Sequence, residues 1–322
     1  MSEQAEAGNV LKSLGREPWL WSFVATVGVW IATLIATGGQ GGGAILSAAL
    51  SFATFTIIVG LGQMLVITTG PGNVDLSIPA TITLSGVVAM KIMDTNNALL
   101  PLGIAAALGA SLVVGLVNYG LIRILRIPPI IATLSSSFIV LSTAISYGRG
   151  IRIKPPPVLD WFSTTRVLGV PLLAFAVLAL SIVIAVLLRR TVYGRTVLAI
   201  GQNARAANLA GLSVDRTRFL TYVLSALLAG VCGIALSGFS GGAALNMGEE
   251  YLLASIAVVV IGGTSVAGGR ANVPGIWGAA LFLYLLVTML NTFGVSSGPR
   301  LIFTGLIIIA VIVIAGGEKQ AR

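Results

Sequence analysis

Long apolar runs that recur along the whole chain restrict its fold more than any other feature. They cover residues 20–37, 44–69, 78–93, 98–122, 128–147, 169–188, 219–240, 250–266, 273–293 and 300–315. A hydrocarbon core about 30 Å thick takes about 20 helical residues to cross. Only 9% of the 322 residues are charged, which excludes a water-soluble globular domain. We therefore expect an all-α, polytopic membrane protein with about ten transmembrane helices.

Basic residues indicate which side of the membrane the loops occupy. If the N-terminus lies in the cytoplasm, 13 of the 19 Lys and Arg residues fall in inner segments. This agrees with the excess of Lys and Arg that cytoplasmic loops carry. We therefore expect cytoplasmic tails at 1–18 and 317–322 around one transmembrane domain at 19–316. The net charge of +9 follows from the inner loops, so the expected partner is membrane lipid and not nucleic acid.

The residue types that the chain lacks exclude several chemistries. It has no histidine, and its one cysteine, Cys232, lies in an apolar run. The chain therefore cannot form a Ser-His catalytic pair, an imidazole metal ligand or an internal disulfide. A serine peptidase built on Ser265 would have no histidine base. We expect no enzyme activity, no cofactor and no metal site.

The first candidate site is the break TTGPGNVDLS at residues 68–77, between two apolar runs. Proline and glycine stop a helix there, and freed backbone groups are tolerated at membrane depth only inside protein or beside water. Asp75 is either an intramembrane carboxylate in a solute path or, with Ser77, a cap on the next helix. The residues assigned to the path from this break are Thr68, Thr69, Asn73, Asp75 and Ser77.

The second candidate site is the break GGTSVAGGR at residues 262–270. A phosphate-binding loop of the G-x-x-x-x-G-K-[ST] kind needs a Gly-Lys pair, which the chain does not contain, so nucleotide is not hydrolysed through such a loop. Thr264 and Ser265 are candidates for the path. Hydrogen bonding between helices is the alternative role for them. We also expect broken helices near the centre of the bundle, as in many transporters.

The longest polar stretch, at 189–218, is predicted to be a cytoplasmic loop. Asn203 fits the N-cap of a short helix over 204–212. Small residues at Ala206, Ala207, Ala210 and Gly211 would let this helix lie close against another protein. A docking element and a solvated connector are the two interpretations, and the small residues favour docking.

These three segments together resemble the ribose-type permease family of bacterial ABC importers. The resemblance rests on GQMLVITTGPGNVDLS, GRTVLAIGQNARAANLAGL and IAVVVIGGTSVAGG, and it covers roughly residues 45 to 315. It implies a dimeric permease in the bacterial cytoplasmic membrane that imports a sugar or similar small polar solute. An extracytoplasmic binding protein would deliver the solute, and a separate ATP-binding subunit would contact the coupling helix at Ala199, Gly201, Asn203, Ala206, Ala207, Ala210, Gly211 and Leu212.

Two departures from the family pattern bear on the solute and the partners. The stretch Gly70 to Val74 is longer than in the family, which changes the expected cavity. Leu252 and Ala254 replace an acidic pair, and the nearby Glu249 and Glu250 are assigned to binding-protein contact. The second permease copy is therefore either identical or a paralogue that supplies the missing groups. The alternative function is an ion-coupled secondary transporter, in which Asp75 would bind a proton or sodium.

Overall fold

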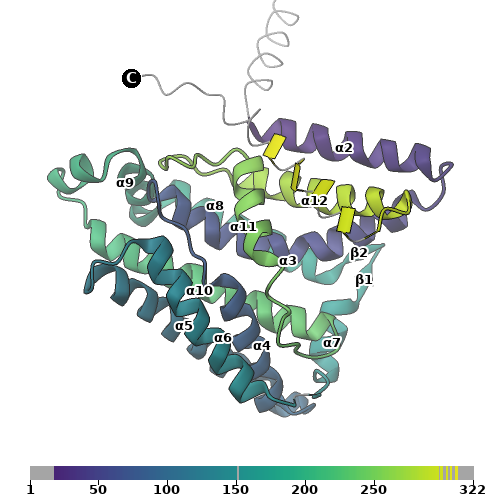
Figure 1. The fold of residues 1–322 in the computed structure, drawn as a ribbon, viewed down its shortest axis with the longest axis horizontal. Coiled ribbons are helices and arrows are strands. Elements are labelled where there is room, and N and C mark those ends of the chain that lie inside the picture. Colours follow the sequence, from purple (N-terminus) through teal and green to yellow (C-terminus); the bar gives the residue numbers. More distant parts are fainter. Residues whose placement is uncertain are drawn as a thin grey trace, which may run out of the picture.

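The computed structural model describes residues 18–150 and 152–296, and the pairs 298–299, 302–303, 305–306 and 309–310. In these parts the regular secondary structure is helical apart from one short β-hairpin, and loops connect the helices (Figure 1). The elements are α2 (Pro18–Ala36), α3 (Gly42–Thr68), α4 (Ile78–Met93), η1 (Asn97–Leu99), α5 (Leu100–Arg123), α6 (Pro129–Gly148), α7 (Pro157–Thr164), β1 (Arg166–Val167), β2 (Val170–Pro171), α8 (Leu172–Arg190), α9 (Val192–Leu209), α10 (Val214–Phe239), α11 (Tyr251–Ile261) and α12 (Val273–Thr292).

The lengths of the apolar helices confirm an all-α polytopic membrane protein. Within the described ranges, seven helices are long and apolar enough to cross a membrane, namely α2, α3, α5, α6, α8, α10 and α12, while α4 and α11 are shorter. These nine helices coincide with nine of the predicted segments. The tenth segment, 300–315, lies largely outside the described residues, so the number ten stays a prediction.

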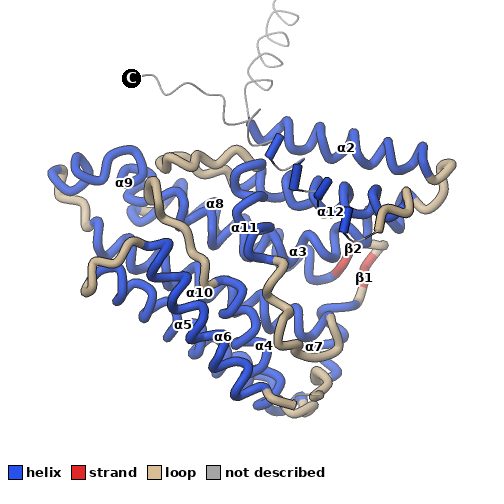
Figure 2. The backbone as a smooth tube through the Cα atoms, viewed as in Figure 1, coloured by secondary structure: helices blue, strands red, loops and turns tan. Residues whose placement is uncertain are grey.

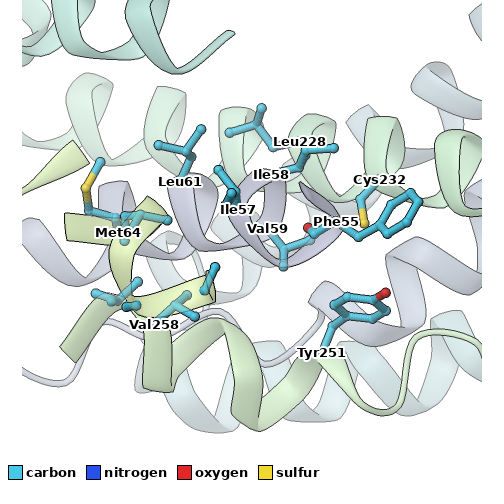
Figure 3. Close-up of a cluster of buried hydrophobic side chains, with 14 of the residues drawn as sticks. Phe55, Ile57, Ile58, Val59, Leu61, Met64, Leu228, Cys232, Tyr251 and Val258 are labelled. Carbon is cyan, nitrogen blue, oxygen red and sulfur yellow. Dashed lines mark hydrogen bonds between the residues drawn. The ribbon is translucent and has the colours of Figure 1, made fainter. Parts of the chain in front are cut away.

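Helix α3 forms the centre of the bundle because it is apolar on all sides. Every residue from Ala53 to Thr68 is buried, and α3 packs against α8, α10, α11 and α12. In Figure 3, Phe55 of α3 lies beside Cys232 of α10, and the Cys232 Sγ is 3.6 Å from the Phe55 carbonyl oxygen. The core therefore sits where α3 and α10 meet.

Helix α4 crosses α10 at a glycine, Gly233. A Cβ on Gly233 would collide with the Ile82 carbonyl group and the Ser85 hydroxyl group, because the two backbones are in close contact. Small residues permit such an approach between membrane helices, where packing and not water exclusion drives association.

We expect Gly233→Leu to lower the free energy of unfolding by about 1–3 kcal/mol, because the added side chain overpacks this crossing. Gly109→Leu on the exposed face of α5 is the matched control, since nothing lies within 4 Å of the position that an added Cβ would take. Denaturant unfolding in micelles compares the two variants. Equal stability of the two would contradict the crossing described above.

The first break makes α4 begin inside the bundle. After α3 ends at Thr68, the chain turns back along it in non-helical conformation until Ile78. The Asp75 backbone amide donates to the Gln63 side-chain oxygen at 3.3 Å, which places Asp75 beside α3 and not beyond its end. Helix α4 is consequently too short to cross the membrane by itself.

The second short helix, α11, also begins within the bundle. Its first residue, Tyr251, is buried and hydrogen-bonds Tyr284 of α12, whose hydroxyl lies 3.1 Å from that of Thr56, near the midpoint of α3. Just before it, the Gly248 backbone touches that of Pro79 at the start of α4. The non-helical segment 240–250 therefore descends to membrane depth before α11 starts, and Figure 2 shows it as a loop crossing the near face.

Different elements lie at the two ends of the bundle (Figures 1 and 2). Helix α9 occupies one end, and α7 with the β1–β2 hairpin occupies the other. The hairpin is antiparallel, with Arg166 opposite Pro171 and Val167 opposite Val170. We refer to these as the α9 end and the hairpin end.

Candidate functional site

The three segments that carry the family resemblance meet at one point at the α9 end. The Gly269 amide donates to the Thr68 carbonyl at 2.9 Å, and Gly268 packs on the backbone of Gly70. From α9, Gly201 faces the Thr68 carbonyl and the Gly269 backbone so closely that no Cβ fits. At this junction α9 is in close backbone contact with both breaks, a relation that sequence order alone does not reveal.

Asn203 divides α9 into two arms. Its backbone is extended, with φ −160° and ψ 100°, and its side-chain oxygen accepts the Ala206 amide at 2.9 Å. The predicted cap is therefore confirmed. The arm that follows ends at Leu209 and not at 212, because the chain turns at Gly211, whose φ is +81°, and the Leu212 amide donates to the Ala207 carbonyl at 3.0 Å.

The residues assigned to the coupling contact separate into two groups. Gly201 and Ala207 are buried against this chain, and Ala199 and Leu212 are half-buried. Asn203, Ala206, Ala210 and Gly211 are exposed. Leu209, which is not among the residues that the sequence assigned to the coupling contact, is 82% exposed at the tip of the helix. An exposed leucine among small residues is suited to contact another protein.

Asp75 is the centre of a buried hydrogen-bond cluster. Asp75 is only 1% exposed. One of its carboxylate oxygens accepts hydrogen bonds from the Ser77 amide at 3.0 Å and from the Ser77 hydroxyl at 2.6 Å. The other oxygen accepts the Ser225 hydroxyl of α10 at 2.7 Å. This geometry supports the structural alternative, in which Asp75 fixes the turn into α4. Its place in a solute path stays a prediction.

Further amides and hydroxyls extend the cluster to α5 and α6. The Asn118 amide donates to the Ser77 hydroxyl at 2.7 Å, and Asn118 also accepts from Ser136. The Leu76 amide donates to the Thr133 hydroxyl at 3.0 Å. Sequence reasoning did not find these partners, although a lone asparagine in the apolar run of α5 was the available signal. Four helices, α4, α5, α6 and α10, are thus held around one carboxylate.

Other residues assigned to the path are satisfied locally. The hydroxyls of Thr68 and Thr69 donate to carbonyls of α3 at 2.6 and 2.7 Å. Asn73 donates to the Gly70 carbonyl at 3.1 Å. Thr264 accepts the Asn272 amide at 3.2 Å and is buried, while Ser265 is half-buried in the same turn. The assigned residues therefore form two groups, one at the junction and one around Asp75, and not one continuous wall.

Glu249 and Glu250 lie in the segment that precedes α11. Both are exposed, and they follow Gly248, which contacts Pro79 at the start of α4. The two glutamates therefore lie inside the length of the bundle and not at its hairpin end. Their assignment to binding-protein contact is not tested by this position and stays a prediction.

A helical bundle with two helices that begin inside it, and with a capped helix exposed at one end, has the architecture of a membrane transport protein. Residues 45–315 match the family described as branched-chain amino acid transport system / permease component. The chain belongs to this family, as a ribose-type permease of ABC importers. It is a multi-pass protein of the inner membrane, a transport subunit and not an enzyme.

Individual relatives agree with this classification. A probable ABC transporter permease of Sinorhizobium fredii is 31% identical, over 93% of this chain and 90% of its own length. The ribose import permease of Escherichia coli is 32% identical over 82% of each chain. The L-arabinose permease of the same species is 30% identical over 84% of this chain and 86% of its own length. No solved structure matches the chain. The family implies an ATPase subunit and a solute-binding protein as partners.

Proposed function

We propose that this chain, as one of two permease copies, carries a sugar or similar small polar solute through the inner membrane. The relatives named for ribose, arabinose and fructose support this class of solute. The observation that carries the proposal is the junction of Gly201, Thr68 and Gly269, because it couples an exposed helix to both breaks. The second copy is an identical chain in the simplest arrangement.

The α9 end faces the cytoplasm in this proposal, and α9 is the coupling helix. Arg189, Arg190 and Arg205 on and beside it follow the cytoplasmic excess of basic residues. Both termini are then cytoplasmic, with 300–315 as the tenth span. The hairpin end faces the solute-binding protein.

The mechanism that we propose is alternating access. ATP binding draws the α9 helices of the two copies together. Because the junction admits no gap between α9 and the two breaks, the movement reaches segments 69–77 and 262–272. The starts of α4 and α12 then shift, and the path opens to the opposite side.

We expect Leu209→Asp to lower ATP-driven uptake and co-purification of the ATPase subunit by roughly five-fold or more, because a central apolar contact is worth more than about 1 kcal/mol. Leu168→Asp is the matched control for co-purification of the ATPase subunit, since Leu168 is 99% exposed in the hairpin at the opposite end. Membrane content of both variants is measured by immunoblotting. Normal uptake with Leu209→Asp would exclude the tip of α9 from the ATPase contact.

A further inference from the structure

Helix α8 has an apolar outer face that no described element of the chain covers. Four large apolar side chains on it are exposed, namely Phe175, Leu178, Ile182 and Val186. Because successive members are three or four residues apart, all four lie on one side of the helix. In a membrane, such a face contacts lipid chains or another apolar helix.

The charged residues of α8 lie only at its α9 end. Of its 19 residues, the last two, Arg189 and Arg190, are charged, and both are exposed. A helix of this length is about 28 Å long, which is close to the roughly 30 Å of a hydrocarbon core. The apolar face therefore ends in two guanidinium groups at the level where lipid phosphate groups begin.

The tight corner between α8 and α9 adds a third arginine. The Thr191 hydroxyl donates to the Leu187 carbonyl at 2.6 Å and accepts the Gly194 amide at 3.1 Å, so one side chain joins the two helices. A Cβ on Gly194 would collide with the backbone of Leu187 and Leu188. The next residue, Arg195, is exposed and starts from this same corner. We refer to Arg189, Arg190 and Arg195 as the arginine cluster.

The arginine cluster has no acidic partner in the part of the chain that the structure describes. Helices α3, α9 and α12 pack against α8 and contain no acidic residue. Helix α7, which contains Asp160, contacts α8 but lies at the hairpin end (Figure 1). Among the described residues, the one ion pair joins α5 to α10 and does not involve the cluster. Three positive charges are therefore concentrated at this corner without compensation.

The charge and the apolar face together indicate what binds here. Guanidinium groups bind phosphate through paired hydrogen bonds, but a soluble phosphate would leave the apolar face of α8 uncovered. A second copy that packed its own α8 here about a twofold axis would place arginines opposite arginines, which is unfavourable. A lipid with a negatively charged headgroup complements both features, because its phosphate meets the arginines and its chains meet the apolar face.

We propose that the corner between α8 and α9 binds an anionic phospholipid. The phosphate group lies at the arginine cluster, and an acyl chain lies along the apolar face from Val186 toward Phe175. The bound headgroup holds the first arm of α9, residues 192–202, at the membrane surface, while the tip at Leu209 extends beyond it. Lipid binding at this corner requires neither solute nor the ATPase subunit.

Native mass spectrometry of the full-length chain tests the proposal. The protein is purified in detergent and titrated with dioleoylphosphatidylglycerol, which is anionic, or with dioleoylphosphatidylcholine, which is zwitterionic. In the test variant, all three residues of the arginine cluster are replaced with glutamine. In the matched control, Arg126→Gln, Arg205→Gln and Arg216→Gln remove the same charge from exposed positions at the same end of the bundle.

We expect the parent protein to bind phosphatidylglycerol at least roughly ten-fold more tightly than phosphatidylcholine, because each arginine near the phosphate adds to the attraction. The test variant loses this preference, and the control variant keeps it to within about two-fold. Equal losses in the two variants would overturn the proposal, because they would show diffuse attraction to a basic surface. A parent protein that does not distinguish the two lipids would also overturn it.

Two further measurements exclude other occupants. Glycerol phosphate, which has no acyl chains, is expected to bind at least roughly ten-fold more weakly than phosphatidylglycerol, and equal binding would contradict the role of the apolar face. Co-purification with the ATPase subunit is measured for the same variants. A test variant that keeps its lipid preference but loses the ATPase subunit would assign the arginine cluster to that subunit and overturn the proposal.

Discussion

Replacing Gly201 with valine is expected to reduce ATP-driven uptake by roughly ten-fold or more while the protein still reaches the membrane. A Cβ at this position would collide with the Thr68 carbonyl and with the Gly269 backbone. These are backbone atoms and cannot rotate away, so α9 must separate from both breaks. The contact through which a movement of α9 would reach the two breaks would then be lost.

Two comparisons make this result specific. Gly43→Val is the matched control, since Gly43 is exposed and nothing lies within 4 Å of the position of an added Cβ. Co-purification of the ATPase subunit with Gly201→Val separates lost coupling from lost docking, because Gly201 itself is buried and not on the exposed tip. Uptake by Gly201→Val equal to that of Gly43→Val would show that the junction transmits nothing.

Asp75→Leu is expected to lower the free energy of unfolding by about 3–5 kcal/mol, because it leaves buried donors without an acceptor. The Ser77 amide and the hydroxyls of Ser77 and Ser225 all donate to this carboxylate. Asp75→Asn should lose much less stability, since its oxygen accepts from Ser77 and its amide can donate to the Ser225 hydroxyl. Thermal unfolding in detergent measures both variants.

The pair of variants also separates the two interpretations of Asp75. In the structural interpretation, uptake follows stability, so the asparagine variant retains more transport than the leucine variant. Equal loss of uptake in both, with the asparagine variant as stable as the parent protein, would show that ionisation of Asp75 is part of the transport cycle.

The sequence predicted those parts of the fold that depend on local pattern. Apolar runs predicted the positions of nine helices, and the glycine and proline residues at 70–72 indicated the break after α3. Asn203 was predicted as a cap because capping involves only residues three positions apart. These features are set by periodicity and local chemistry.

Relations between distant segments were not predictable in the same way. Hydropathy does not tell which faces of helices meet. Asn118 in an apolar run indicated a buried polar contact, but neither it nor Ser225 identified the cluster around Asp75 as that contact. The separation of Gly201 and Ala207 from the exposed residues of α9 likewise depends on packing.

We infer that a separate ATPase subunit, which binds α9, supplies the energy for transport through this bundle. The most direct test is uptake into proteoliposomes that hold the chain with its solute-binding protein, in the presence and absence of the ATPase subunit. We predict that solute accumulates against its gradient only with the ATPase subunit and ATP, and that a proton or sodium uncoupler has no effect. Accumulation by the chain without the ATPase subunit would contradict the account.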